Sequence, residues 1–334
     1  MISRLFADFN AAVRLDEIRV KRPTQIFLCG GEIPRPDVPG PAKCARHSFY
    51  RHLQQTNSPL LSDLVLAEVI VEDSEEQDNG FKDLLELEQL VAEIVAVILL
   101  FVESPGSYAE LGAFTGNQAI LRRLVVVIDN QFRERPKSFI YLGPLKRLVN
   151  HDERSLVYAT WLNEDSPNAM DEDSAQTMAV ALSRSMPTFQ KRNGDTALLS
   201  TAKGESELNE GELMCLITGL LDVFLALGLE EVEEALGLFE RLSSGQKISR
   251  YLYVLRKLGL VDRVSHSNKW WYYSRRSLVD WSFQSVSQHK TTLDWRRHFR
   301  DAYERARITD SGARKRHGAL GKIMQILTGN ERHG

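Results

Sequence analysis

The feature that most constrains the fold is an apolar run of strand length that stops at a turn and passes directly into a helical pattern. Residues 98–102 are Ile-Leu-Leu-Phe-Val, and the polar stretch Glu103-Ser-Pro-Gly-Ser107 follows at once. Proline and glycine favour a tight turn, and helical spacing begins immediately after it. Residues 98–114 therefore predict a strand, a turn and a helix start. The carboxyl end of a parallel strand is where open α/β sheets bind ligands.

Apolar segments of strand length alternate with helical patterns along the first half of the chain. We predict strands near residues 25–31, 64–71, 94–102 and 124–129, and helices near residues 42–56, 81–93 and 107–122. Near-continuous apolar strands between helices indicate a parallel sheet covered on both faces. The predicted fold class is α/β, a doubly wound (flavodoxin-like) parallel sheet, in a domain of residues 1–155. An amphipathic helix at residues 2–20 is expected to pack on this domain or on another subunit.

A chain of 334 residues exceeds what one core usually holds, and its second half has a different pattern. Residues 156–208 turn polar and predict a helical connector. Three helical patterns follow near residues 212–227, 230–242 and 246–258, and two short strands then surround the polar turn Ser267-Asn268. This order predicts a smaller winged-helix domain over residues 209–285. Residues 286–334 are expected to form a basic helical tail.

Composition narrows the class of protein. Three cysteines, Cys29, Cys44 and Cys215, show no metal-ligand spacing, so neither a disulfide framework nor a metal site is suggested. The first residues lack a signal-peptide core, and no stretch approaches the ~20 apolar residues of a membrane span. We therefore expect a cytoplasmic protein. Acids dominate residues 63–93 and bases dominate residues 286–334, so the basic end is expected to meet an anionic partner.

Glu110 is the first candidate for chemistry. It follows Ser107 by three residues, and Ser-x-x-Glu at a helix start is typical of a capping box. Alternatively, the carboxylate points out over the strand ends, where the helix N-terminus favours the ionised form that a nucleophile or a cation stabiliser needs. Glu103 is a second candidate acid, or a residue that binds loop amides. Two carboxylates in one cleft allow glycosyl-transfer chemistry.

The residues around Glu110 resemble a known family. Gly106-Ser107-x-x-Glu110-x-Gly112 is similar to the Gly-Thr-x-x-Glu-x-Gly segment of nucleoside 2-deoxyribosyltransferases. In that family the glutamate attacks the anomeric carbon of a nucleoside, so the resemblance implies that Glu110 is catalytic. Those enzymes usually carry an aspartate two residues before the glycine, where it assists protonation of the leaving base. Ser104 stands at that position here, which argues against the ordinary transferase reaction.

A closer resemblance is to effector proteins of bacterial retrons that pair a deoxyribosyltransferase-like domain with a C-terminal winged helix. Three segments carry it in the same order: Ile26-Phe-Leu-Cys-Gly-Gly31, Leu100-Phe-Val-Glu-Ser-Pro-Gly-Ser-Tyr-Ala-Glu-Leu-Gly-Ala-Phe114 and Ser138-Phe-Ile-Tyr-Leu-Gly-Pro144. The resemblance is strong over residues 24–148 and architectural beyond them. It implies an antiphage toxin that splits the N-glycosidic bond of NAD, with NAD as substrate and no further cofactor.

The same resemblance implies partners and a mechanism. The partners are the retron reverse transcriptase and the branched RNA–DNA product (msDNA), which hold the effector inactive, together with self-association into an oligomer or filament. Glu110 would oppose the positive charge that develops on the ribose as nicotinamide leaves. Nicotinamide is already a cationic leaving group and needs no proton on departure. Serine at position 104 is therefore less damaging for NAD than for a neutral nucleoside.

The candidate substrate-binding residues lie at strand ends and in the turn before Glu110. They are Gly30, Gly31, Glu72, Gly106 and Ser107. A glycine pair after the first strand can admit a ribose or phosphate close to the backbone, although a plain strand-to-loop turn is an equally good explanation. Glu72 and Glu88 are weaker candidates, because most carboxylates in so acidic a region are solvated.

Basic residues interleaved with aromatics mark the third C-terminal helix and the hairpin after it, a pattern that suits nucleic acid. Arg250, Tyr253 and Lys257 share the helix face opposite the apolar one, and that face is expected to meet a groove or a phosphate backbone. The candidate nucleic-acid-binding residues are Arg250, Lys257, Arg263, Lys269, Arg275 and Arg276. Alternatively, the aromatics fill a small core, the charges are solvated, and residues 290–307 cover a protein partner.

Three hypotheses for function follow. The first is an NAD-cleaving glycosidase of a retron, restrained by its nucleic-acid partner. The second is a nucleoside or nucleotide N-glycosidase or deoxyribosyltransferase that uses the same Glu110. The third is a non-enzymatic winged-helix regulator whose α/β domain senses a nucleotide.

Overall fold

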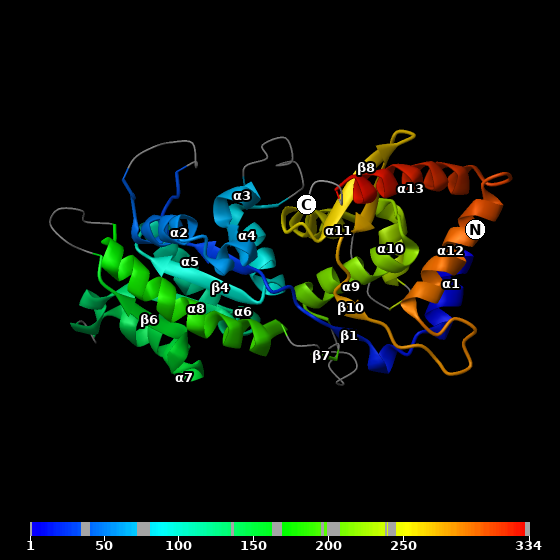
Figure 1. Ribbon diagram of the computed structural model, residues 1–334. Helices are drawn as coiled ribbons and strands as arrows, with labels where there is room; N and C mark the ends of the chain where they lie inside the picture. The colour runs from blue at the N-terminus through cyan, green and yellow to red at the C-terminus, as the bar shows by residue number, and fades with distance from the viewer. Residues whose placement is uncertain are drawn as a thin grey trace. The chain divides into compact units, whose positions relative to one another are not determined.

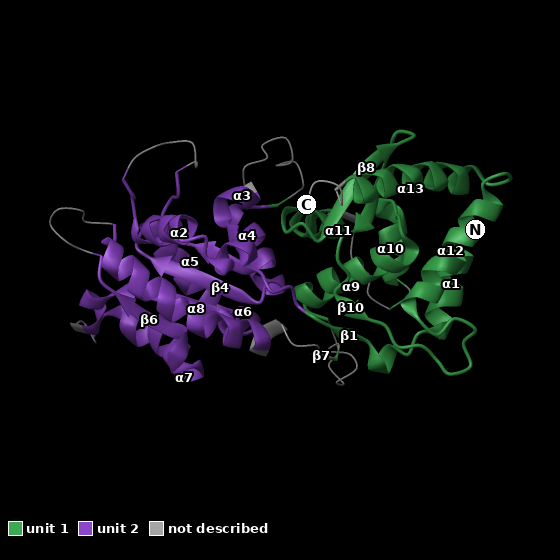
Figure 2. Cartoon of the chain, in the orientation of Figure 1, with its two compact units in different colours: residues 1–21, 76–81, 196–334 green, residues 22–75, 82–195 purple. Residues whose placement is uncertain are grey.

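The chain forms two compact units, coloured separately in Figure 2. Residues 22–75 and 82–195 form the unit named here the α/β unit, and residues 1–21, 76–81 and 196–334 form the helical unit. The computed structural model describes residues 2–34, 41–71, 81–134, 137–161, 169–194, 197–198, 208–237, 239 and 245–330.

A five-stranded parallel sheet organises the α/β unit (Figure 1). In spatial order its strands are β3 (Leu64–Leu66), β2 (Ile26–Cys29), β4 (Val97–Val102), β5 (Leu124–Asp129) and β6 (Leu156–Ala159). All neighbouring strands are parallel. This order confirms the predicted doubly wound, flavodoxin-like sheet. The topology switches direction between β2 and β4, whose carboxyl ends are therefore the expected place for a ligand.

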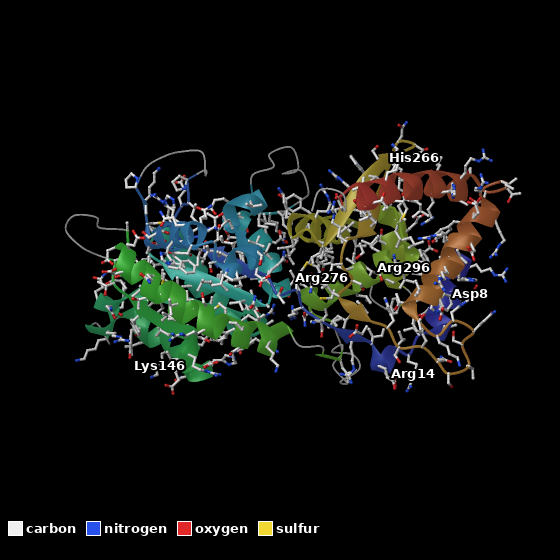
Figure 3. The ribbon with its side chains drawn as sticks, viewed as in Figure 1. Asp8, Arg14, Lys146, His266, Arg276 and Arg296 are labelled. Atoms are coloured by element: carbon white, nitrogen blue, oxygen red, sulfur yellow. The ribbon has the colours of Figure 1, made fainter. Side chains whose placement is uncertain are left out.

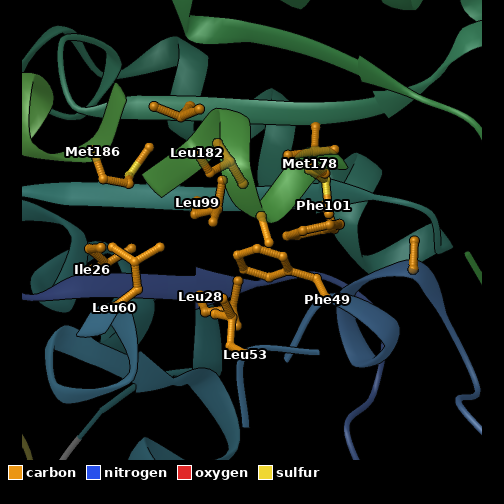
Figure 4. Packing of buried hydrophobic residues seen from close by; sticks show 14 of the residues in the cluster. Ile26, Leu28, Phe49, Leu53, Leu60, Leu99, Phe101, Met178, Leu182 and Met186 are labelled. Atoms are coloured by element: carbon orange, nitrogen blue, oxygen red, sulfur yellow. The ribbon is translucent and has the colours of Figure 1, made fainter. Parts of the chain in front are cut away.

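One face of the sheet is covered by α2 (Ala45–Gln55) and α8 (Glu172–Gly194). Alternate residues of β2, β4 and β5 point to this face, as the two-residue period of a strand requires. The helix residues packed against them include Phe49, Leu53, Met178, Leu182 and Met186 (Figure 4). Burying a side chain of this size stabilises the fold by about 1.5–3 kcal/mol.

The remaining residues of β2, β4 and β5 are buried as well, so the centre of the sheet is covered on both faces. Helix α5 (Pro105–Gly116) packs on β4, and α4 (Leu84–Ile94) begins where the Asp83 side chain accepts the Glu86 N–H. The shorter elements of the unit are α3 (Ala67–Val71), α6 (Gln118–Leu121), α7 (Lys146–His151), a π-helical turn (Tyr141–Leu145) and 3-10 turns at Pro59–Asp63, Asn130–Glu134 and Glu153–Ser155.

The observed boundaries of this unit differ from the predicted ones. Residue 155 does not end the domain, because β6 pairs with β5 and α8 closes the core, both within the predicted connector of residues 156–208. The strand β6 is short and only partly buried, so it lacks the long apolar run of the other strands. The predicted strand at residues 64–71 ends at Leu66 and continues as α3, where Glu68 bonds to a buried arginine.

The helical unit contains three helices followed by a hairpin, as predicted. These are α9 (Glu210–Phe224), α10 (Leu229–Gly237), α11 (Gly245–Lys257), β8 (Val261–His266) and β9 (Lys269–Ser274). Ser267 and Asn268 both have positive φ, which is the backbone of a two-residue hairpin turn. Leu227, between the first two helices, forms an isolated antiparallel bridge with Tyr272 of β9. The hairpin therefore gains a third short strand-like partner.

The chain termini also belong to this unit. They contribute α1 (Ile2–Ala12), a 3-10 turn (Leu15–Glu17), α12 (Thr292–Ala306) and α13 (Ser311–Asn330). A small sheet in the same unit consists of β10 (Val279–Asp280), β1 (Arg19–Val20) and β7 (Ala197–Leu198), in that order. The prediction that the first helix packs on the first domain is wrong, because Phe6 and Phe9 pack edge-on against Phe224 of α9. Within the predicted basic tail, residues 292–306 and 311–330 are helical as predicted, but they pack into the unit through buried side chains such as Phe299 and Tyr303.

Among the described residues, no helix is both long enough and apolar enough to cross a lipid bilayer.

Candidate active site

The turn before Glu110 is built by two serines. Ser104 is the N-cap of α5: its side chain accepts the Ser107 N–H at 3.2 Å, and the Ser107 hydroxyl oxygen accepts the Ser104 N–H at 2.8 Å. Ser107 is 1% exposed and also accepts the Glu103 N–H. Pro105 stands at the first helical position, where its missing N–H costs no hydrogen bond. The helix is thus capped completely by residues 104–107.

This cap decides between the two roles predicted for Glu110. The predicted capping box of Ser107 with Glu110 is wrong, because the helix starts two residues earlier and Ser107 is itself the third helical residue. Glu110 lies one turn further on, and its Oε2 atom is buried with no hydrogen-bond partner among the described residues. A buried carboxylate oxygen without a donor is costly, and such groups in native proteins call for an explanation. The cap of α5 therefore makes no use of the Glu110 carboxylate.

Glu103, the second predicted acid, has a different environment. Its Oε1 accepts the N–H of Gly31 at 3.0 Å and that of Arg46 at 3.2 Å, and its Oε2 accepts the N–H of Ala45 at 2.6 Å. Burial raises the pKa of Glu103, and the three backbone donors oppose that shift. The carboxylate satisfies the first turn of α2 and the end of β2 together. These contacts show that Glu103 holds the end of β2 and the start of α2 together.

The glycine pair after β2 packs closely against the end of β4 and against Glu103. Gly30 has φ +140°, and a Cβ there would lie 2.8 Å from the Phe101 Cβ and backbone oxygen. A Cβ at Gly31 would lie 2.9 Å from the Glu103 Oε1 atom. Glycine is therefore required at position 30 by the packing of β2 against β4, and a side chain at position 31 would displace the Glu103 carboxylate. Both residues lie where they were predicted, at the carboxyl end of the first strand.

An ion pair between the buried Arg46 and Glu68 lies next to the glycines, and the sequence did not predict it. The Arg46 side chain is 1% exposed, and it binds both oxygens of Glu68 at 2.8 and 2.6 Å. Its other donor positions reach the backbone oxygens of Gly31 at 2.9 Å and Leu28 at 2.8 Å. A signal existed in the sequence, because Arg46 shares the apolar helix face of Phe49 and Leu53 and so brings a charge to a buried side.

Electrostatic coupling shows which groups the fold brings together. Burial raises the pKa of Glu110 to about 7, with Arg46 lowering it and Glu68 raising it further. Burial also raises the pKa of Glu88 on α4 to about 7, and the charge of Glu110 adds to that shift. The thiol of Cys29 has a strongly raised pKa from burial and from Glu110 and Glu88. We name this set of coupled side chains the carboxylate cluster. It lies at the carboxyl ends of β2 and β4 and consists of Glu110, Glu88 and Glu68 with Arg46 and Cys29.

The other predicted substrate-binding residues divide as follows. Gly106 is exposed at the first turn of α5, with open space where a Cβ would stand apart from the Ser104 Oγ at 3.9 Å. The Ser107 hydroxyl is engaged in the helix cap described above. Glu72 lies outside the described residues. The described residues contain no group of His, Cys, Asp and Glu side chains arranged to hold a metal ion.

A separate hollow of about 900 Å³ lies along the other side of α5. Tyr108, Gly112 and Thr115 line it from the helix, and Phe139 and Pro144 line it from the π-helical region. Glu110 is not among its lining residues. The candidate active site is therefore defined by its charges and hydrogen bonds, and this hollow is a different surface.

The basic residues predicted to bind nucleic acid are mostly anchored by partners. Arg275 pairs with Asp262 at 3.0 Å, and Lys269 lies 3.8 Å from Glu231 and over the Trp271 ring. Arg263 stacks over the half-exposed Trp270 ring at 4.2 Å. Arg276 is exposed at the end of the hairpin (Figure 3). The hairpin therefore carries exposed basic side chains, one of which is stacked on an aromatic ring.

The predicted outward face of α11 is less open than expected. Tyr253 is only 6% exposed and packs edge-on against Phe81, with 5.7 Å between ring centroids. Arg250 lies over the same Phe81 ring and Lys257 lies over the Tyr253 ring. The prediction that Tyr253 faces a groove is wrong, because the unit supplies its own aromatic cover there. Arg250 and Lys257 remain partly exposed.

The fold and the site together define a protein with a doubly wound α/β unit, a buried carboxylate cluster at the carboxyl edge of its sheet, and a unit of helices with a basic hairpin. Residues 42–263 match the family described as STM3845 retron effector protein. That match covers most of the chain, and the chain belongs to this family of retron effectors.

Two curated Escherichia coli proteins are similar to part of the chain. One is named "Retron Ec86 putative ribosyltransferase/DNA-binding protein" and is 35% identical over 133 residues, which are 40% of this chain and 39% of that protein. The other carries the same designation for retron Ec73 and is 26% identical over 156 residues, 46% of this chain and 48% of that protein. The chain thus aligns with less than half the length of each relative.

Proposed function

We propose that this chain is a retron effector enzyme that hydrolyses the N-glycosidic bond of NAD, with Glu110 as the catalytic residue. The observation that carries the proposal is the buried, unpartnered Oε2 atom of Glu110 at the switch point of the sheet. The resemblance of its segment to deoxyribosyltransferases and the ribosyltransferase names of the two relatives support glycosyl transfer at that carboxylate.

In the proposed reaction the bond between the ribose C1′ atom and the nicotinamide nitrogen breaks, and its electron pair stays with the nitrogen. Water then bonds to C1′, which gives ADP-ribose, neutral nicotinamide and one proton. Positive charge builds on the ribose before water arrives, and an ionised Glu110 stabilises it electrostatically or by transient attack on C1′. No cofactor other than the substrate NAD takes part.

The surroundings of Glu110 favour a leaving group that departs without a proton. Ser104 stands where related enzymes carry an aspartate, and its hydroxyl is bonded within the helix cap. Glu103 accepts three backbone N–H groups, so its carboxylate form is the one that the structure uses. A cationic nicotinamide leaves as a neutral molecule, and it needs neither residue as an acid.

One observation favours a second candidate function, a nucleoside or nucleotide N-glycosidase or deoxyribosyltransferase. Glu88 is 6% exposed and has a pKa of about 7, so it is partly protonated at neutral pH beside Glu110. A carboxyl group that is partly protonated at neutral pH can supply an acid for a neutral base. Glu88 would then take the role of the missing aspartate.

We further propose that the helical unit restrains this enzyme through its partners. The order of three helices and a hairpin, with the bridge at Leu227, is that of a winged helix, and both relatives carry "DNA-binding" in their names. The proposed partners are a retron reverse transcriptase and branched RNA–DNA, with self-association into an oligomer or filament in the cytoplasm. A non-enzymatic regulator that only senses a nucleotide is the remaining alternative.

A substrate panel separates these functions. Purified chain, free of and then bound to reverse transcriptase and msDNA, is incubated with NAD, 2′-deoxynucleosides and deoxynucleotides, and released base is measured by chromatography, with Glu110→Gln as the blank. We expect nicotinamide from NAD only, and less of it when the partners are bound. Base release from nucleosides alone would support the second function. No release from any substrate by the partner-free chain would favour the regulator.

A further inference from the structure

We propose that Arg46 is the positioning residue of this site: its guanidinium fixes the glycine turn at the carboxyl end of β2 and favours the ionised form of the Glu110 carboxylate, while Glu68 holds Arg46 in place. The proposal deepens the proposed function and rests on it for the role of Glu110. Neither Arg46 nor Glu68 belongs to the motif that led to Glu110.

The geometry of Arg46 explains why an arginine is needed. Its two terminal nitrogens bind the backbone oxygens of Leu28 and Gly31, which lie on either side of Gly30. The same two nitrogens bind the two Glu68 oxygens, so a planar fork satisfies four acceptors at once. The backbone N–H of Arg46 also donates to Glu103. A lysine ammonium has no such fork, so it cannot hold both sides of the turn.

Burial makes the charge of Arg46 effective. With 1% exposure, its guanidinium is shielded from water and from salt, and it acts on its neighbours through a medium of low polarity. Glu68 is the residue that compensates this buried charge, and Glu68 is in turn fixed because it accepts the Ile33 N–H at 3.1 Å. Removing one member alone leaves the other charge unpaired inside the protein.

Charged groups act on the Glu110 carboxyl from different elements. They are Arg46 from α2 and Glu68 from α3, and the charge of Glu110 in turn raises the pKa of Glu88 on α4 and of the Cys29 thiol on β2. Arg46 is the one cation in this set, and it lowers the pKa of Glu110 that burial raises. The two members of the ion pair therefore act on Glu110 in opposite directions, and this opposition can be measured.

The test compares full-length Arg46→Met, Arg46→Lys and Glu68→Gln with wild type, using nicotinamide release from NAD between pH 5.5 and 9. We expect the midpoint of the acid limb to rise by about one pH unit in Arg46→Met and to fall in Glu68→Gln, because the first removes a cation and the second an anion. Arg46→Lys should keep a midpoint near wild type and raise KM, since it retains the charge but not the fork. Lower rates with unmoved midpoints would overturn the proposal.

A second readout does not depend on turnover. The Glu110 carboxyl carbon is titrated by 13C NMR in the same proteins, with its signal assigned by its loss in Glu110→Gln. Opposite shifts without any NAD cleavage would leave the assignment of Arg46 standing and reject the proposed function. Cleavage by wild type without opposite shifts would reject Arg46. If Arg46→Met does not fold, Glu68→Gln still decides, because only a downward shift agrees with the proposal.

Discussion

Charged side chains are compensated differently in the carboxylate cluster of the α/β unit and in the charged hairpin of the helical unit. In the cluster, acidic side chains share one buried guanidinium, and Glu110 keeps an oxygen without a donor among the described residues. In the hairpin, Arg275 pairs with Asp262 and Lys269 lies near Glu231. In the hairpin these charges are compensated by partners, whereas an unsatisfied carboxylate oxygen at the edge of a parallel sheet is what makes Glu110 the candidate in the proposed function.

The largest effect on stability is expected where a charge satisfies the backbone. Glu103→Ala removes the acceptor of three N–H groups at the end of β2 and the start of α2, and it should lower the free energy of unfolding by roughly 3 kcal/mol or more. Urea denaturation measures the change. Glu110→Gln is the matched control, because it alters a carboxylate that holds no backbone group. An equal loss in both variants would contradict the contrast between the two residues.

A somewhat smaller loss is expected in the helical unit for Arg316→Met. Arg316 is 2% exposed, bonds to the Ala226 backbone oxygen and Glu231, and lies over the rings of Trp271 and Tyr303. Its removal should cost about 2–3 kcal/mol, with Lys269 left to compensate Glu231 in part. Thermal unfolding should show this shift and almost none for the exposed control Arg300→Met. A silent Arg316→Met would mean that the tail is not part of this core.

The next effect concerns pH. The folded-state pKa of Glu88 is about 7, above its ordinary value of 4.5, so between these values the folded chain binds more protons than the unfolded chain. The stabilising contribution is therefore complete below about pH 4.5 and is lost as the pH rises through 7. Glu88→Gln should unfold with roughly 1–2 kcal/mol more free energy than wild type at pH 8, with little difference at pH 5. The exposed control Glu153→Gln should match wild type at both pH values.

The smallest effect on stability is expected for Arg276→Ala. This side chain is exposed, so unfolding should change by less than about 0.5 kcal/mol. If the hairpin contacts phosphates, affinity for a duplex oligonucleotide should fall, and the slope of log affinity against log salt should decrease by about 0.9. Fluorescence anisotropy across a salt series measures both values. An unchanged slope would remove Arg276 from the proposed nucleic-acid surface.

The sequence predicted the regular parts of the fold well, because long apolar strands and glycine turns are local signals. The order of the central strands and the strand, turn and helix around Glu110 are of this kind. The edge strand β6 was missed, since a short, half-buried strand gives little pattern. The connector was predicted to be helical, but the packing of α8 into the core of the sheet was not predicted. The place of α1 was also wrong, because an apolar helix face shows that it is buried and not against which partner.

The candidate site was predicted in part. Gly30 and Gly31 follow one strongly apolar strand segment, and Glu110 follows another. The structure brings the ends of both strands to one edge of the sheet. The cap of α5 depended on where the helix begins, which is the least certain feature of a helical pattern. Arg46 and Glu68 come from helices whose relation to the strand ends arises only in three dimensions. Their contact depends on the three-dimensional fold, and no sequence motif contains these two residues.

The most direct test of the account is the rate of nicotinamide release from NAD by Glu110→Gln and Glu103→Gln, compared with wild type at pH 8 under conditions where all three are folded. The account predicts that Glu110→Gln loses at least about 1,000-fold in kcat, because the charge that stabilises the ribosyl cation is gone. Glu103→Gln should lose far less once its lower stability is allowed for. Turnover by Glu110→Gln near the wild-type rate would contradict the central claim.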